Sequence, residues 1–275
     1  MTGGVSREAL VAARGRLNTL VDSTGVDATS LADDLAQVTA LLDREVSLRR
    51  VLTDPSQPGE AKADLVGRLL GGQISGEAVD LVSGMVRARW STSRDLVDAT
   101  EELADTADLI AAEGAGTLDS VEDELFRFGR ILAGAPELRS TLSGKDSGEA
   151  LRSARNNLVE RLLGGRVAPT TQRLIARLVL RPRGRSLEAG LESLSRLAAE
   201  RRNRSVAVVV SAVPLSDGQK SRLAGALGRM YGRDIQLNLD VDPSVLGGIS
   251  VRIGDEVIHG TVADRLDEVR RRMAG

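Results

Sequence analysis

The first 113 residues repeat one pattern, in which apolar side chains recur at intervals of three and four between short polar turns. This spacing places the apolar side chains on one face of a helix. The clearest stripe consists of Leu31, Leu35, Val38, Leu41 and Leu42. Six such stretches follow one another with short loops between them, and this succession predicts a compact helical bundle over residues 1–113.

Proline and glycine mark the ends of the predicted helices. Asp54-Pro55 ends a short helix at 46–52, because proline cannot continue the hydrogen-bond ladder. Gly71-Gly72 ends the next helix, and a longer helix is predicted over 94–113. Gly114-Ala115-Gly116 then interrupts the pattern, which places a boundary near residue 113.

The helical pattern recurs over residues 114–204. The string LVGRLLGG at 65–72 reappears as LVERLLGG at 158–165, and Leu48-Arg49 matches Leu138-Arg139. A matched order of helices around a shared string favours an internal duplication. The second copy lacks a first helix of its own. Either the helix at 94–113 serves both copies, or the second bundle is one helix smaller.

Residues 205–275 change from helical spacing to strand patterns. A β-branched run at 205–213 predicts a central strand, and alternation at 235–241 predicts a second one. Between them, Ser216 and Gln219 form a capping box for a helix. A hairpin is predicted at 249–258, with its turn at Gly254-Asp255.

The end of the chain predicts one more helix. We expect Gly260 to break the second hairpin strand, and Thr261 with Asp264 to cap a helix over 262–273. The fold class is therefore mainly α with a small α/β C-terminal domain. Two related helical bundles, 1–113 and 114–204, precede a strand-helix-strand-hairpin-helix unit at 205–275.

Composition excludes several classes of protein. The 275 residues are 41% hydrophobic and 28% charged with a net charge of −2, which describes a soluble globular protein. The chain has no cysteine, so disulfides, thiolate metal sites and thiol nucleophiles are excluded. No apolar run reaches the ~18 residues of a membrane span, so we expect membrane association only through partners.

Candidate catalytic chemistry is missing from the sequence. His259 is the only histidine, and we place it in a turn with a capping or surface role. No lysine follows Gly247-Gly248, so those glycines do not form a phosphate loop. Asp33-Asp34 and Glu101-Glu102 are interpreted as solvated charge or short-range ion pairs on exposed helical faces. We predict no catalytic residues, no cofactor and no metal site.

Two arginine-rich segments support a different class, a nucleic-acid-binding or other scaffold adaptor. They lie at 181–185 (RPRGR) and 201–204 (RRNR). Only three of the 37 basic residues are lysine, so arginine is the default cation of this chain. The aromatic content of 1% leaves no platforms for stacking bases. We favour contact with acidic helices of a protein partner, and no nucleic acid.

The C-terminal third resembles a known family, the delta subunit of bacterial F-type ATP synthase, whose mitochondrial counterpart is the oligomycin-sensitivity-conferring protein. The resemblance is closest over 205–275 and departs from the family pattern at His259 and Thr261, where Asp and Ser are usual. The residues that carry it, which we expect to shape the backbone rather than to contact partners, are Pro214, Asp242, Pro243, Gly247, Gly248, Gly254, Asp255 and Gly260.

The resemblance implies a non-catalytic stator subunit of the peripheral stalk, present in one copy per complex on the cytoplasmic face of the bacterial plasma membrane. In the family, the helical domain packs N-terminal helices of the alpha subunits into its grooves, and the C-terminal domain meets the b subunit. An additional helical bundle is a departure from the family. Which bundle would hold the alpha subunits is left open, and so are the contact residues.

Overall fold

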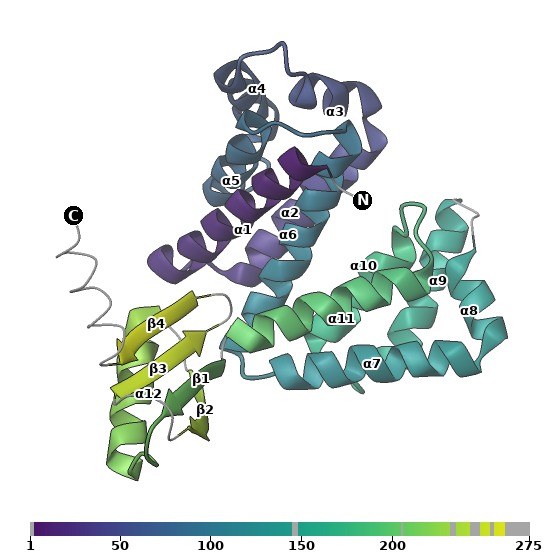
Figure 1. The fold of residues 1–275 in the computed structure, drawn as a ribbon. Helices are drawn as coiled ribbons and strands as arrows, with labels where there is room; N and C mark the ends of the chain where they lie inside the picture. Colours follow the sequence, from purple (N-terminus) through teal and green to yellow (C-terminus); the bar gives the residue numbers. More distant parts are fainter. Residues whose placement is uncertain are drawn as a thin grey trace. The chain divides into compact units, whose positions relative to one another are not determined.

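The computed structural model describes residues 3–144, 148–204, 206–231, 235–242, 248–253 and 256–261. Within these residues the chain is mainly helical, as predicted, with a small mixed sheet near the C-terminus (Figure 1). It divides into two compact units, Met1–Leu197 and Ala198–Gly275. The helices are α1 (Gly4–Thr24), α2 (Ala28–Arg44), α3 (Val46–Thr53), α4 (Gly59–Leu70), α5 (Gly76–Arg87), α6 (Ser93–Gly114), α7 (Leu118–Gly134), α8 (Pro136–Ser143), α9 (Glu149–Leu163), α10 (Pro169–Leu180), α11 (Leu187–Arg204) and α12 (Asp217–Tyr231). The strands are β1 (Val206–Ser211), β2 (Gln236–Val241), β3 (Gly248–Ile253) and β4 (Glu256–Thr261).

Local capping explains where several helices begin. The Thr92 hydroxyl accepts the Asp95 N–H, and the Asp95 carboxylate accepts the Thr92 N–H, so α6 starts with a complete capping box. Asp27 caps α2 by accepting the N–H of Thr29. Ser216 and Gln219 form the predicted box at the start of α12. These contacts satisfy backbone donors that have no partner within the helix.

The first six helices enclose a core of their own. Its buried residues run from Ala9 to Ile110 and come from α1–α6 and the Trp90 segment. Trp90 is buried, and its indole N–H donates to the Met85 carbonyl at 2.8 Å. Burying apolar side chains in this way stabilises the bundle by roughly 25 cal/mol per Å² of apolar area. The apolar contacts of this core therefore come from the first bundle alone.

The next helices repeat the first set in length and order. Both ends of α7 and of α8 lie 90 residues after those of α2 and α3, and both ends of α10 lie 93 residues after those of α5. One tertiary contact recurs as well. Asp34 accepts the Ser75 N–H at the start of α5, and Glu124 accepts the Ala168 N–H at the start of α10. That the two bundles arose by duplication stays a prediction.

The repeated glycine pair has the same conformation in both bundles. The Gly71 N–H donates to the Gly67 carbonyl at 2.9 Å, and the Gly164 N–H donates to the Glu160 carbonyl at 2.7 Å. The next glycines, Gly72 and Gly165, both have positive φ, at 79° and 69°. Glycine adopts this backbone without strain, so the pair ends α4 and α9 in the same way.

α6 lies between the two sets of helices. It packs against α2 within the first bundle and also contacts α10 and α7 of the second. Of the two alternatives that the sequence left open, the arrangement of contacts favours the one in which this helix serves both bundles. Its apolar face belongs to the first core, and its acidic face carries the contacts with α10 described below.

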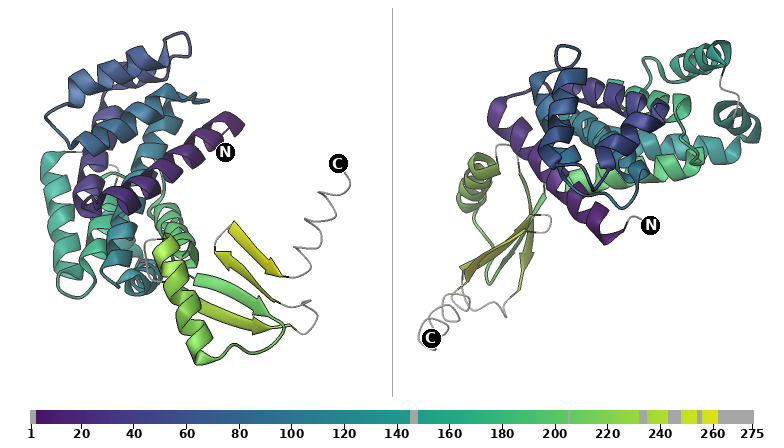
Figure 2. Two further views of the ribbon diagram at one scale, coloured as in Figure 1. Left: turned by 90° about the vertical axis from the view of Figure 1, so that its left-hand side faces the viewer. Right: turned by 90° about the horizontal axis from the view of Figure 1, so that it is seen from above.

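The C-terminal unit is a four-stranded sheet in the order β2-β1-β3-β4. β1 is central, as predicted, and pairs parallel with β2 and antiparallel with β3. α12 packs alongside the sheet (Figure 2). Its Leu227 is buried together with residues of the sheet such as Ala207, Val209 and Val251. This small core is separate from that of the first bundle.

The structure corrects the prediction for the end of the hairpin. β4 does not break at Gly260 but continues to Thr261, because the backbone of β3 offers partners as far as Gly248. Thr261 is therefore a strand residue, and its predicted role as a helix cap stays a prediction. His259 also lies in β4, opposite Ser250, and not in a turn. The helix predicted over 262–273 lies outside the described residues.

Candidate partner-binding surfaces and the arginine–carboxylate layer

The family motif residues within the described chain lie at the ends of strands. Gly248 begins β3 with a φ of 85°, a conformation that a side chain would strain. The Asp242 N–H, just after β2, donates to the Ser211 carbonyl at 3.0 Å at the end of β1. Pro214 is exposed in the segment between β1 and α12, and Gly260 lies in β4. Pro243, Gly247, Gly254 and Asp255 lie outside the described residues. Their role in shaping the fold stays a prediction.

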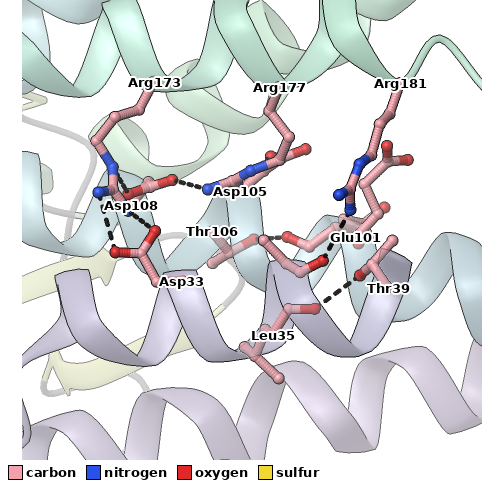
Figure 3. A network of polar contacts seen from close by, with 12 residues as sticks. Asp33, Leu35, Thr39, Glu101, Asp105, Thr106, Asp108, Arg173, Arg177 and Arg181 are labelled. Atoms are coloured by element: carbon pink, nitrogen blue, oxygen red, sulfur yellow. Dashed lines mark hydrogen bonds and ion pairs between the residues drawn. The ribbon is translucent and has the colours of Figure 1, made fainter. Parts of the chain in front are cut away.

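A layer of ion pairs joins α10 to α6 and α2. In Figure 3 the side chains of Arg173 and Arg177 point toward carboxylates on the two helices below, while Arg181 donates to the Ala36 carbonyl of α2. Arg177 donates to Asp105 at 2.8 Å and to Asp108 at 2.7 Å. Arg173 donates to Asp108 at 3.0 Å and to Asp33 of α2 at 2.6 Å. Each buried carboxylate thus meets at least one guanidinium, which is what charge out of water requires.

The loop after α10 extends this layer. Arg185 donates to Glu101 at 2.6 Å, and Arg183 pairs with Asp98. Arg183 is buried and has a positive φ of 50°, which is uncommon for a residue with a side chain. Arg94, one turn before Asp98 on α6, donates to the Arg183 carbonyl, so α6 holds both the backbone and the side chain of this residue.

Burial changes the proton affinity of the carboxylates in the layer. It raises the pKa of Glu101 to about 7, although Arg185 acts in the opposite direction. It raises the pKa of Asp105 to about 6 against the attraction of Arg177. The pKa of Asp108 is also raised by burial. Desolvation therefore outweighs ion pairing at this face of α6, and the layer is sensitive to pH near neutrality.

These contacts overturn the interpretation of Glu101 as solvated charge, and they add contacts within the chain to the arginines of segment 181–185. Glu101 is 5% exposed and not solvated, while Asp33 and Asp34 make contacts far along the chain with Arg173 and Ser75. In the segment 181–185, Arg183 and Arg185 pair with carboxylates of this chain. The missed signal was spacing: Glu101, Asp105 and Asp108 recur at four and three, and Arg173, Arg177 and Arg181 recur at four.

Exposed apolar side chains are the other candidates for partner contact. Val11 of α1 and Phe126 of α7 are both 63% exposed. In the first bundle, Val46, Val51 and Leu69 are also exposed, and Leu69 lines a shallow recess whose other lining residues are aliphatic as well. Such side chains favour protein contact over solvent when they gather on one surface.

The described residues contain no group of three or more His, Cys, Asp or Glu that could hold a metal ion. None of the described helices is long and apolar enough to cross a membrane. What the geometry presents is helical surface, internally paired charge and a small sheet. The class that this fold and these surfaces define is a structural adaptor of helical bundles.

Comparison with known proteins identifies the family. The model of the ATP synthase delta (OSCP) subunit family matches residues 106–273. The ATP synthase subunit delta of Streptomyces griseus is 68% identical over 98% of both chains, and that of Streptomyces avermitilis is 67% identical over 98% of both. The ATP synthase subunit delta of Thermobifida fusca is 50% identical over 99% of both.

The chain belongs to the ATP synthase delta (OSCP) subunit family. Membership confirms the prediction of a peripheral-stalk subunit of the F-type ATP synthase, with a structural role in an enzyme complex associated with a membrane. It does not favour the nucleic-acid-binding alternative. The match begins within α6 and leaves most of the first bundle outside the family model.

Proposed function

We propose that the chain joins two parts of the ATP synthase that must stay fixed relative to each other while the rotor turns. One helical bundle binds N-terminal helices of the alpha subunits in the catalytic head, and residues 205–275 bind the b subunit of the stalk. The chain works on the cytoplasmic face of the bacterial plasma membrane, in one copy per complex. The observation that carries this proposal is the family match over residues 106–273.

A joint of this kind must bind both parts with high affinity and stay rigid under torque, and it needs no catalytic activity. Amphipathic partner helices supply such binding when their apolar faces are buried in grooves between helices. Only the interaction energy that remains after the costs of association appears as affinity. A few well-buried apolar anchors supply most of that remainder. The exposed side chains of Val11 and Phe126 are candidates for such anchors in the first and second bundle.

We propose three domains, 1–113, 114–204 and 205–275, of which the first two are duplicated copies. The confinement of the first core to residues 9–110 supports the first boundary. The recurrence of helix lengths and of the contacts of Asp34 and Glu124 supports the duplication. The family match to the second bundle favours that bundle as the one that binds the head, and the first bundle then adds a second stator contact.

A pull-down tests this division. Residues 1–113, 114–204 and 205–275 are immobilised separately and incubated with a membrane extract, and bound chains are identified by mass spectrometry. We expect the alpha subunits to bind to one of the two helical fragments and the b subunit to bind to residues 205–275. Recovery of RNA or unrelated proteins without any synthase subunit would contradict the proposal.

A matched pair of substitutions in the full chain then shows which bundle holds the head. Phe126→Ser and Val11→Ser remove equally exposed apolar side chains, so neither should lower the melting temperature appreciably. If the second bundle binds the head, Phe126→Ser should weaken binding to the isolated head by about 1–3 kcal/mol, as loss of a hot spot does. Val11→Ser should leave that affinity unchanged, and the reverse result assigns the head to the first bundle.

A further inference from the structure

A basic cavity of about 860 Å³ lies in the first compact unit, between α8, α9, the end of α10 and the loop that leads to α11. Among the described residues, six arginines and two carboxylates line it. The arginines are Arg139, Arg152, Arg155, Arg181, Arg183 and Arg185, and the carboxylates are Asp43 and Glu188. The cavity is thus strongly positive, and it shares Arg183 and Arg185 with the ion-pair layer.

The contacts of this chain do not use all of that charge. Arg139 pairs with Glu188 at 3.7 Å, and Arg185 pairs with Glu101 outside the cavity. Arg152 and Arg155 of α9 have no ion pair with any described residue, and they are less buried than Arg183. Two guanidinium groups therefore face the cavity region without a described counterion.

Arg183 gives an independent sign of a missing ligand. Its side chain is only 2% exposed, yet its Nε and Nη1 have no hydrogen-bond partner among the described residues. Burial, followed by the neighbouring Arg185, lowers the pKa of Arg183 to about 10. Unsatisfied buried donors are costly, and a charged donor costs more than a neutral one. Oxygen acceptors supplied from outside the chain would remove this cost.

The rest of the lining indicates which kind of anion fits. Leu142, Leu178, Val179 and Leu187 add aliphatic surface to the arginines, and none of the described residues that line the cavity is aromatic. Without an aromatic platform, a nucleobase has nothing to stack on. A cavity of this size is much larger than one inorganic phosphate needs, since it lies within the roughly 300–1,000 Å³ range of ligand pockets.

We propose that this cavity receives an acidic, amphipathic segment of a neighbouring subunit. Its carboxylates pair with Arg183, Arg155 and Arg152, and its aliphatic side chains lie on the apolar lining. Arginine suits this task because its planar fork binds a carboxylate through two parallel hydrogen bonds. The proposal rests on assembly of the chain into the synthase, but not on which bundle binds the alpha subunits.

Zero-length cross-linking in the purified synthase tests the proposal. Arg155→Lys keeps the positive charge and places a primary amine at the cavity. A carbodiimide then activates a nearby carboxylate, the amine displaces the urea, and an amide bond remains. We expect a cross-linked peptide that joins position 155 to an Asp or Glu of another subunit. Its yield should exceed that of the control by about tenfold, because docking raises the effective concentration.

The matched control is Arg161→Lys, the same substitution on the same helix at an exposed arginine that does not line the cavity. Equal yields from the two variants, or links only to carboxylates of this chain, would overturn the proposal. Since the synthase is purified intact in every case, such a failure leaves the role in the stator untouched.

A second measurement separates a protein ligand from a small anion. The melting temperature of the free chain is compared with and without inorganic phosphate, for the natural sequence and for Arg155→Gln. We expect no stabilisation by phosphate that depends on Arg155. Stabilisation that Arg155→Gln abolishes, together with loss of the cross-link in phosphate, would show that a small anion occupies the cavity instead.

Discussion

Arg177 holds two buried carboxylates at once, and each of its terminal nitrogens donates to a different one. The side chains of Asp105 and Asp108 are 12% and 1% exposed, so water cannot replace the guanidinium if it is removed. A buried ion pair adds little net stability when intact, because desolvation offsets the attraction. Breaking it from one side, however, leaves uncompensated charge.

Arg177→Met should therefore lower the free energy of unfolding by about 3–5 kcal/mol, measured by urea denaturation. The control is Arg127→Met, which removes one partner of the exposed pair between Arg127 and Asp123. That change should cost no more than about 1 kcal/mol. Similar effects of the two substitutions would show that the layer is not a buried structural contact.

Glu101 makes stability depend on pH in an unusual direction. Its pKa rises from the ordinary 4.5 to about 7 on folding, so the folded chain holds a proton that the unfolded chain releases between these values. Asp105, with a pKa raised to about 6, acts in the same sense. Stability from these groups is therefore present at the acidic end of this window and is lost as the pH rises through it.

We expect Glu101→Gln to reduce the difference in unfolding free energy between about pH 6 and about pH 8, measured by denaturant titration. Glu60→Gln is the control, because Arg87 lowers the pKa of Glu60 and its titration lies below this range. If Glu60→Gln changes the pH dependence as much as Glu101→Gln does, burial of Glu101 is not its source.

At the scale of elements, the ends of α4 and α9 offer a direct comparison of the two bundles. A Cβ at Gly71 would lie 2.4 Å from the Gly67 carbonyl oxygen, and one at Gly164 would lie 2.6 Å from that of Glu160. Both oxygens belong to rigid backbone, so the clash cannot be relieved by a side-chain rotation. Gly67 itself lies in α4 with open space around its Cα.

Gly71→Ala and Gly164→Ala should each lower the melting temperature of the chain, whereas Gly67→Ala should raise stability by about 0.5–1 kcal/mol through helix propensity. Thermal unfolding followed by circular dichroism distinguishes these outcomes. A large effect at Gly71 combined with none at Gly164 would mean that the repeated string does not play the same structural part twice.

Helix boundaries were predictable because their signals are local. Asp54-Pro55, Gly71-Gly72 and Ser216 with Gln219 act within a few residues, and the structure places helix ends and caps there. The ion-pair layer was not predictable in the same way, since Asp33 and Arg173 are separated by 140 residues. β4 also ran further than predicted, because pairing with β3 outweighed the tendency of Gly260 to end a strand.

For the whole molecule, the nature of the contact between bundles decides whether they can be separated. The first core lies within residues 9–110, and the face of α6 toward α10 carries Glu101, Asp105 and Asp108. Removing the second bundle would expose these carboxylates, which water solvates well, together with the few apolar side chains of α6, such as Leu109, that are buried outside the first core.

We therefore expect residues 1–113 to fold alone, with a cooperative thermal transition and helical circular dichroism. In this fragment the pKa of Glu101 should fall toward its ordinary value, which NMR titration of the carboxyl carbon measures. A molten fragment that binds hydrophobic dyes would contradict this expectation and would make the second bundle part of the first core.

The apolar face and the acidic face of α6 together suggest how a protein chain gains an additional domain. A helix with one apolar and one acidic side is soluble before anything docks on the acidic side. The first bundle lies mostly outside the family match, so as the added bundle it needed carboxylates at intervals that match the arginines of α10. The larger the charged share of such a contact, the less apolar surface an undocked bundle exposes to water. A stator subunit therefore gains a bundle through charged pairs with less exposed apolar surface than a purely apolar contact would require.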